Sequence, residues 1–220
     1  MRIGKIELRY LGNSGFLISN GKTIYIDPYN LTSSEPKADI ILVTHGHYDH
    51  CSLVDIEKIV KSGTIVAVSA DCQSKITRIE DVNMQIIEQG DELNFQGTRV
   101  QAVPAYNPKK KFHPKSEGWM GFIVKFENII IYHAGDTDNI SEMEKLTGYG
   151  KQGNEFVALL PVGGNYTMNA EEAASAASVI KPTLAIPMHY GAVAGTEKDA
   201  DDFVKFCSEL GVKAVKLEKE

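Results

Sequence analysis

The stretch THGHYDH, residues 44–50, concentrates metal-ligating side chains in a single turn. Four of them fall within six positions of a chain that has only six histidines in all: His45, His47, Asp49 and His50. Imidazole and carboxylate groups together favour borderline divalent metals such as zinc, manganese or iron. Gly46 is expected to let the backbone bend tightly enough for the histidines on either side to face one point. A solvent-exposed polar turn is the alternative, but so dense a cluster favours a site for one or two ions, with zinc as the first choice.

Two later stretches place more candidate ligands at the ends of apolar runs. IIIYHAGDTD, residues 129–138, contains His133, Asp136 and Asp138, and LAIPMHYG, residues 184–191, contains His189. Taken singly, an aspartate in GDT is more typical of a turn, and His189 is equally typical of a buried core. A closed metal site needs ligands from several strand ends, so the three stretches together predict one centre.

The elements that must position these residues are short strands followed by helices. Apolar or alternating runs separated by Gly, Asn or Pro predict strands, and the run 121–135 is expected to turn at Glu127 and Asn128. The predicted strands cover residues 5–11, 15–19, 22–28, 39–44, 64–70, 84–90, 91–97, 99–106, 121–135, 156–164 and 183–191. Helical periodicity and capping residues predict helices over 52–63, around 72–79, and over 169–182 and 197–210. Sheets on the inside with helices on both sides is the α/β architecture that this order indicates.

Composition narrows the class of protein. A chain of 220 residues with 43% hydrophobic content can bury the core of a single domain. A net charge of -6 argues against a general nucleic-acid surface. No apolar run has the length of a signal peptide or a membrane span, so a cytoplasmic protein without a membrane partner is expected. The three cysteines lack CxxC spacing and are expected to be reduced, mostly buried thiols.

The sequence resembles the metallo-β-lactamase-fold hydrolase superfamily. The resemblance lies in the combination of three motifs: HxHxDH after a strand, then GDT, then a strand that ends in histidine. The resemblance runs over nearly the whole chain, from LGNSGFLI at residues 11–18 to IPMHYG at residues 186–191. The sequence is most similar to a compact prokaryotic branch that includes ascorbate-6-phosphate lactonase-like proteins and predicted zinc-dependent hydrolases. This resemblance implies one domain over residues 1–220, folded as a four-layer αββα sandwich with a metal site at the sheet edge.

The resemblance also implies a ligand set. His45 and His47 would bind a first metal, a second would be bound by Asp49, His50 and His189, and Asp136 would bridge the two. Asp27 would support the ligand loops from behind.

A further histidine of the family pattern is missing, because Ala105, Tyr106 and Asn107 stand at its position. His113 is the nearest replacement, with an exposed loop residue as the alternative reading, and His133 is better placed as a supporting residue. We expect His113 to lie near the first metal without bonding to it, and the two metal sites to differ in affinity.

The chemistry expected of such a site is hydrolysis by a metal-bound hydroxide, because a divalent ion lowers the pKa of bound water to about 7. Asp49 would also orient the hydroxide, and the Tyr190 hydroxyl, with the amides near Gly163 and Gly164, would stabilise an oxyanion. Lys109, Lys110 and Lys111 would bind an anionic group on a small substrate, although a solvated hairpin tip is the alternative. Lactones, esters and phosphodiesters are the substrate classes considered.

Three other functions compete with this one. A nuclease or phosphodiesterase of the same fold usually needs a nucleic-acid-binding insertion, for which the chain has no room. A β-lactamase is disfavoured by the absence of an export signal. A non-catalytic metal-binding or redox-sensing protein would use the same ligands. A homo-oligomer is compatible with the sequence, which does not indicate the oligomeric state.

Overall fold

The computed structural model describes residues 1–95 and 97–220, which form two compact units. The first unit contains residues 1–88 and 218–220, and the second contains residues 89–217. Each unit holds one of the two sheets. The strand expected over residues 91–97 includes Gln96, which lies outside the described residues. A single hydrolase domain over residues 1–220 stays a prediction.

The sheet of the first unit has seven strands in chain order. They are β1 (Arg2–Ile3), β2 (Ile6–Gly12), β3 (Gly15–Ser19), β4 (Thr23–Ile26), β5 (Ile40–Val43), β6 (Ile65–Val68) and β7 (Asn83–Ile86). Strands β1 to β4 pair antiparallel, and β4 to β7 pair parallel. The four residues of β5 are all buried, as the apolar run DIILVT predicts for a central parallel strand.

Helix α1 (Leu53–Ile59) follows the metal-ligand turn, and η1 (Ala70–Cys72) and α2 (Gln73–Ile76) follow β6. The expected end of the first helix at Gly63 is wrong, because α1 stops at Ile59 and Val60 is extended. The Ile59 carbonyl accepts a hydrogen bond from the Ala38 amide, and the Lys61 amide donates to the Thr64 side chain. These bonds replace the next helical turn.

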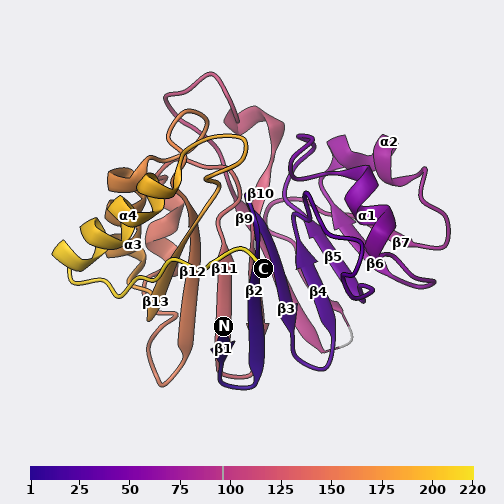
Figure 1. The fold of residues 1–220 in the computed structure, drawn as a ribbon, viewed down its shortest axis with the longest axis horizontal. Coiled ribbons are helices and arrows are strands. Elements are labelled where there is room, and N and C mark those ends of the chain that lie inside the picture. The colour runs from indigo at the N-terminus through magenta and orange to yellow at the C-terminus, as the bar shows by residue number, and fades with distance from the viewer. Residues whose placement is uncertain (96) are drawn as a thin grey trace. The chain divides into compact units, whose positions relative to one another are not determined.

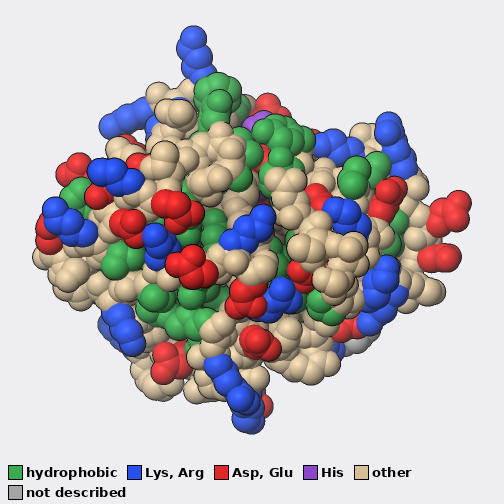
Figure 2. Space-filling model, in the orientation of Figure 1, with side chains coloured by type: hydrophobic (Ala, Val, Ile, Leu, Met, Phe, Trp, Pro, Cys, Tyr) green, Lys and Arg blue, Asp and Glu red, His purple; other side chains and the backbone are tan. Residues whose placement is uncertain are grey.

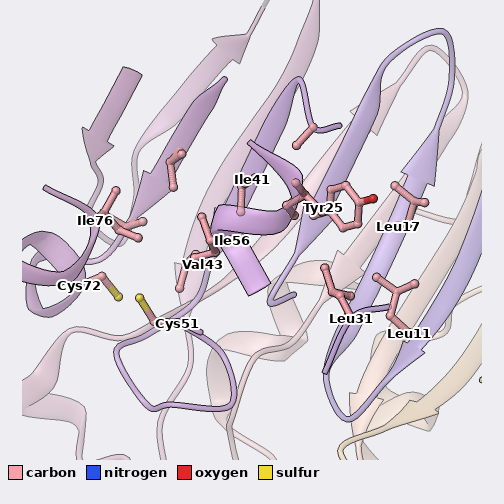
Figure 3. Close-up of a cluster of buried hydrophobic side chains, with 14 residues drawn as sticks. Leu11, Leu17, Tyr25, Leu31, Ile41, Val43, Cys51, Ile56, Cys72 and Ile76 are labelled. Atoms are coloured by element: carbon pink, nitrogen blue, oxygen red, sulfur yellow. The ribbon is translucent and has the colours of Figure 1, made fainter. Parts of the chain in front are cut away.

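A buried apolar cluster joins the first unit's sheet to its helices, with Ile41 and Val43 of β5 packed beside Ile56 of α1 (Figure 3). The thiols of Cys51 and Cys72 point toward each other in this cluster. All three cysteines of the chain are buried and free, which confirms the expectation of buried thiols. Cys51 directly follows His50, so the turn that carries the candidate ligands is continuous with a packed core.

The sheet of the second unit has six strands in the order β13-β12-β11-β10-β9-β8. They are β8 (Glu92–Phe95), β9 (Thr98–Pro104), β10 (Met120–Phe126), β11 (Ile129–His133), β12 (Glu155–Pro161) and β13 (Leu184–Met188). Strands β8 to β11 pair antiparallel, and β11 to β13 pair parallel. The hairpin between β10 and β11 turns at Glu127 and Asn128, as expected, and Glu127 adopts a φ of 41°.

Helices α3 (Ala170–Ile180) and α4 (Glu197–Glu209) pack together and lie beside β12 and β13 (Figure 1). The expected capping box of α3 is confirmed: the Asn169 side chain accepts from the Glu172 amide, and the Glu172 carboxylate accepts from the Asn169 amide. Two short 3-10 helices lie in connections between strands of this sheet. The connection from β9 to β10 contains η2 (Lys115–Glu117), and the connection from β11 to β12 contains η3 (Ser141–Leu146).

Parallel strands bring candidate ligands to one sheet edge within each unit. In the first unit, Asp27 follows β4 and His45 comes two residues after β5, its parallel neighbour. In the second unit, Asp136 comes three residues after β11, and His189 directly follows β13. Because the carboxyl ends of parallel strands share an edge, each unit collects its own set of polar side chains there.

Candidate metal centre

The ligand turn of the first unit holds two close pairs of donor atoms. His45 Nε2 lies 3.0 Å from His47 Nδ1, and His50 Nε2 lies 3.4 Å from Asp49 Oδ2. The side chains of His45, Asp49 and His50 are buried, and His47 is half-buried. Ligands of one tetrahedral ion with bonds of about 2.0–2.1 Å lie about 3.3 Å apart, so both separations suit shared metal binding.

The carboxylate of Asp27 holds this turn in place. One carboxylate oxygen, Oδ1, accepts from the Thr44 amide at 2.8 Å. The other, Oδ2, accepts from the Thr44 hydroxyl at 2.7 Å and lies 2.7 Å from His50 Nδ1. With Nδ1 of His50 held by a carboxylate, Nε2 is left as the atom that can bind metal, which is the supporting arrangement typical of ligand histidines.

Asn13 is a supporting residue that the sequence reasoning missed. Its side-chain amide donates to Asp49 Oδ2 at 3.0 Å, and the residue is 1% exposed with a φ of 51°. Its carbonyl oxygen, Oδ1, is buried and has no hydrogen-bond partner among the described residues. An asparagine within the turn-forming residues of LGNSG, a type enriched in left-handed backbone, was the signal that could have identified it.

Gly46 has a different role from the one expected. Its φ is not among the positive values of the described residues, so the turn does not require glycine's conformational freedom. A Cβ there would instead lie 2.4 Å from Asp71 Oδ2, which accepts the Gly46 amide hydrogen at 2.9 Å. Lys75 Nζ donates to the Gly46 carbonyl at 2.6 Å. Glycine therefore leaves room for the Asp71 carboxylate to accept the Gly46 amide hydrogen.

In the second unit, two histidines approach one aspartate. His113 Nε2 and His189 Nε2 each lie 3.2 Å from Asp136 Oδ2. His113 is 2% exposed, Asp136 4% and His189 1%. The reading of His113 as an exposed loop residue is therefore wrong. Whether His113 bonds to a metal ion stays a prediction.

His113 is buried because its loop folds back onto Asn107, one of the residues at the position where the family pattern expects histidine. The Asn107 side-chain amide donates to the carbonyls of Phe112 and Tyr166 at 2.8 and 2.6 Å. His113 Nδ1 lies 3.0 Å from the Tyr166 carbonyl, and its φ is 57°. A hydrogen bond from Nδ1 to that carbonyl leaves Nε2 with its lone pair toward Asp136, as a metal ligand requires.

The other expected residues of the second unit have mixed roles. His133 is fully buried, and its Nδ1 accepts from the Gly135 amide at 3.2 Å. The Tyr190 hydroxyl donates to the Leu217 carbonyl at 3.3 Å, so its hydrogen bonding gives no support to the expected oxyanion role. A Cβ on Gly163 would lie 2.5 Å from the His189 carbonyl oxygen, so this glycine allows the close packing of the His189 segment.

The lysine loop is only partly available to bind an anion. Lys110 Nζ pairs with Asp138 Oδ1, donates to the Thr167 carbonyl and lies 3.6 Å from Glu172. Lys109 and Lys111 are exposed. Lys115 donates to Glu142 at 2.9 Å, which lowers the pKa of Glu142 to about 2. Lys110 is therefore held by Asp138 and Thr167, and its expected contact with a substrate stays a prediction.

Comparison with known proteins gives the family. A model described as the Beta-lactamase superfamily domain matches residues 7–189. The chain belongs to this superfamily. A UPF0173 metal-dependent hydrolase of Thermoplasma acidophilum is 34% identical over 218 residues, with 94% of this chain and 92% of the relative covered. A UPF0173 metal-dependent hydrolase of Archaeoglobus fulgidus is also 34% identical, covering 94% and 93%.

Solved structures of metal-dependent hydrolases have a similar fold. A candidate metal-dependent hydrolase of Parabacteroides distasonis has a TM-score of 0.84 at 28% identity, covering 98% of this chain and 94% of that one. Igni18, a metallo hydrolase of Ignicoccus hospitalis, has a TM-score of 0.77 at 25% identity, covering 97% and 95%. These matches confirm the expected α/β fold class of the metallo-β-lactamase type. The chain is a metal-dependent hydrolase of the β-lactamase superfamily.

Seven histidine and aspartate side chains of the described residues could hold a metal ion: His45, His47, Asp49, His50, His113, Asp136 and His189. Across the described ranges, 1–95 and 97–220, no helix is long and apolar enough to cross a membrane. On the face drawn in Figure 2, basic and acidic side chains are interspersed rather than gathered by sign.

Proposed function

We propose that the chain hydrolyses a small substrate at a centre of one or two divalent ions, with zinc as the first choice. His45 and His47 would bind one ion, together with His113. The second ion would be bound by Asp49, His50 and His189, and Asp136 would contact both. Family membership and the buried, oriented donor atoms within each unit support this assignment.

The chemistry of the donor set fits a resident metal. Two histidines have one ring nitrogen occupied by an oxygen of a supporting group: His50 by Asp27 and His113 by the Tyr166 carbonyl. Their other ring nitrogens lie beside a carboxylate, Asp49 and Asp136 respectively. Pre-oriented imidazoles beside buried carboxylates are costly unless a cation balances the charge. This arrangement of paired donors is the observation that carries the proposal.

A bound divalent ion would supply a Lewis acid and lower the pKa of a coordinated water to about 7. The chain's own residues would then orient the reactants. Asp49 would accept the proton of the attacking water, while Asn13 holds its carboxylate in place. The buried Oδ1 atoms of Asn13 and Asn107, which have no partner among the described residues, would accept hydrogen bonds from water or substrate.

The substrate classes that suit this chemistry are lactones, esters and phosphodiesters. If the substrate carries an anionic group, Lys109 and Lys111 are the exposed cations of the loop next to His113 that would contact it. Replacing both with Ala should raise KM for an anionic substrate and leave metal content unchanged. Equal kinetics at low salt would exclude this role.

Metal analysis combined with a substrate panel tests the proposed function. The purified protein, loaded separately with zinc, manganese and iron, is assayed on a lactone, a carboxylate ester and a phosphodiester. His50→Ala and His189→Ala should each remove metal and abolish hydrolysis, whereas Lys205→Ala, at an exposed lysine of α4, should change neither. Unchanged metal content in both histidine variants would exclude the assigned ligands. Metal binding without hydrolysis of any substrate class would favour the non-catalytic or redox-sensing alternative.

A further inference from the structure

A cavity of about 340 Å³ lies within the second unit, between its sheet and residues 140–149, which include η3. Gln101 of β9, Ile123 of β10 and Tyr132 of β11 line the side formed by the sheet. These residues are register neighbours on adjacent strands, so their side chains share one face of the sheet. None of the seven candidate metal ligands lines the cavity, so the proposed metal centre does not explain it.

The cavity has the size and the lining of a small-molecule site. Its volume falls within the range of roughly 300–1,000 Å³ that is typical of ligand pockets. The side chains of Ile123, Ile140 and Met143 are buried and make much of its wall apolar. Gly90 and Lys145 are lining residues that are exposed, so the cavity opens to solvent. The apolar part of a small molecule that enters would leave water for this wall, which favours binding.

Tyr132 provides the cavity with an unused hydrogen-bond donor. The residue is 1% exposed, and its hydroxyl forms no hydrogen bond with any of the described residues. Burial raises the pKa of Tyr132, so the hydroxyl keeps its proton and can donate it. A buried tyrosine hydroxyl usually has a hydrogen-bond partner, because a buried donor without one is costly. Since Tyr132 lines the cavity, a molecule bound there can supply the acceptor.

The other polar groups around the cavity favour an uncharged acceptor over a carboxylate. Gln101 Oε1 accepts from Lys125 Nζ at 3.4 Å, so the Gln101 amide hydrogens remain as further donors. Glu142, the acidic residue of the lining, is paired with Lys115 at 2.9 Å, which lowers the pKa of Glu142 to about 2 and keeps it negatively charged. A carboxylate bound at Tyr132 would be repelled by Glu142 and would lack a buried cation, which is costly, whereas a carbonyl oxygen needs only the donors.

We propose that this cavity binds a small, uncharged organic molecule whose carbonyl oxygen accepts a hydrogen bond from the Tyr132 hydroxyl. The apolar part of the molecule packs against Ile123, Ile140 and Met143. The inference goes beyond the proposed function, because it assigns a second binding site that contains no candidate metal ligand and whose occupant need not be hydrolysed. Ketones, esters and amides all present such an oxygen, and a simple aryl ketone serves as the probe.

Binding of matched probes to the intact chain tests the inference. Acetophenone and α-methylstyrene have nearly the same shape, but a methylene group replaces the carbonyl oxygen in the second, and benzoate carries a charge instead. Titrations are followed by the NMR signal of the Met143 methyl group, which belongs to the cavity wall. Acetophenone should bind about three- to tenfold more tightly than α-methylstyrene, which is the effect of one hydrogen bond. Tyr132→Phe deletes only the hydroxyl, so it should abolish this ratio and leave the affinity for α-methylstyrene unchanged.

A second pair of variants checks that the probes occupy the cavity. Val103→Phe enlarges a half-buried lining side chain and should weaken the binding of both uncharged probes about tenfold or more, because it removes apolar contact area. Val54→Phe makes the same change at an exposed valine of α1 and should leave binding unchanged.

Four results would overturn the inference. Equal affinities for acetophenone and α-methylstyrene, or a difference that survives Tyr132→Phe, would exclude the hydrogen bond to the carbonyl oxygen. Tighter binding of benzoate than of acetophenone would exclude an uncharged ligand. A Met143 signal that no probe shifts would show that the cavity takes up water only.

Discussion

At the scale of single residues, the candidate site depends on side chains that hold ligands as much as on the ligands. Asp27 fixes His50, Asn13 fixes Asp49, and the Tyr166 carbonyl fixes His113. Such partners select the ring nitrogen or carboxylate oxygen that faces the metal, and their loss typically costs 10–100-fold in metal affinity or activity.

Asn13→Ala should weaken metal binding by roughly 10–100-fold, because Asp49 would lose the hydrogen bond that orients its carboxylate. Competition titration of the apo-protein with a metal chelator measures the change. Asn165→Ala, at an exposed asparagine, serves as the matched control. An Asn13→Ala variant with wild-type affinity would show that Asp49 needs no such support.

Asp55 gives a prediction about pH. Burial alone would raise its pKa, but hydrogen bonds from Lys58, Ser52 and the Leu31 and Asn30 amides outweigh it and lower the pKa. A lowered pKa means that the ionised carboxylate stabilises the fold above its unfolded pKa of about 3.9, and that this stability is lost as pH falls through the folded value. Asp55→Asn should therefore lower the free energy of unfolding by about 1–3 kcal/mol at pH 7.

Urea unfolding of the metal-free protein and of Asp55→Asn at pH 7 and at successively lower pH checks this expectation. The difference between the two proteins should shrink as the pH drops below about 3.9. A difference that stays constant down to the lowest pH at which both fold would rule out the charge as its cause.

At the scale of elements, glycines permit the close packing that brings ligand segments together. Gly163 follows β12 and leaves no room for a Cβ beside the His189 carbonyl, which lies just beyond β13. Gly46 plays the same part between the ligand turn and Asp71 of η1. An added methyl group would push against the backbone of His189 at Gly163 and against the Asp71 side chain at Gly46.

Gly163→Ala should displace His189 and reduce metal occupancy while leaving the two sheets folded. Gly150→Ala is the matched control, because its added Cβ would meet its nearest neighbours at 3.4 Å, an ordinary contact distance. Elemental analysis and circular dichroism of both variants provide the measurement. Full occupancy in Gly163→Ala would indicate that the His189 segment can relax without cost to the centre.

At the scale of the whole molecule, the metal is expected to stabilise the fold, since its proposed ligands are buried in the folded chain. Saturating the apo-protein with zinc should raise its Tm, because an ion that binds only the folded state adds a free energy of RT ln(1 + [L]/Kd). In a metal titration of the apo-protein, His113→Ala should weaken one binding step, because that ion would lose one of its proposed histidine ligands. Two equal tight steps that survive His113→Ala would remove His113 from the ligand set.

The sequence by itself determined the fold class and the order of most elements, and it gave the candidate ligand positions that the proposed function uses. Strand periodicity, the capping box at Asn169 and the HxHxDH turn are local patterns, and a local pattern can be read from neighbouring residues. The end of α1 at Ile59 could not be read in this way, because hydrogen bonds to Ala38 and Thr64 compete with the helix.

Only the tertiary structure decided which residues support the ligands. His113 lies six residues from Asn107 but becomes buried through contacts with Tyr166, 53 residues further along the chain. Asn13 reaches Asp49 across 36 residues, and Lys110 is held by Asp138 and Thr167 rather than left in solvent. Chain packing brings these partners, which are far apart in sequence, within hydrogen-bond distance of one another. No local spacing of residue types predicts which distant residues will meet in this way.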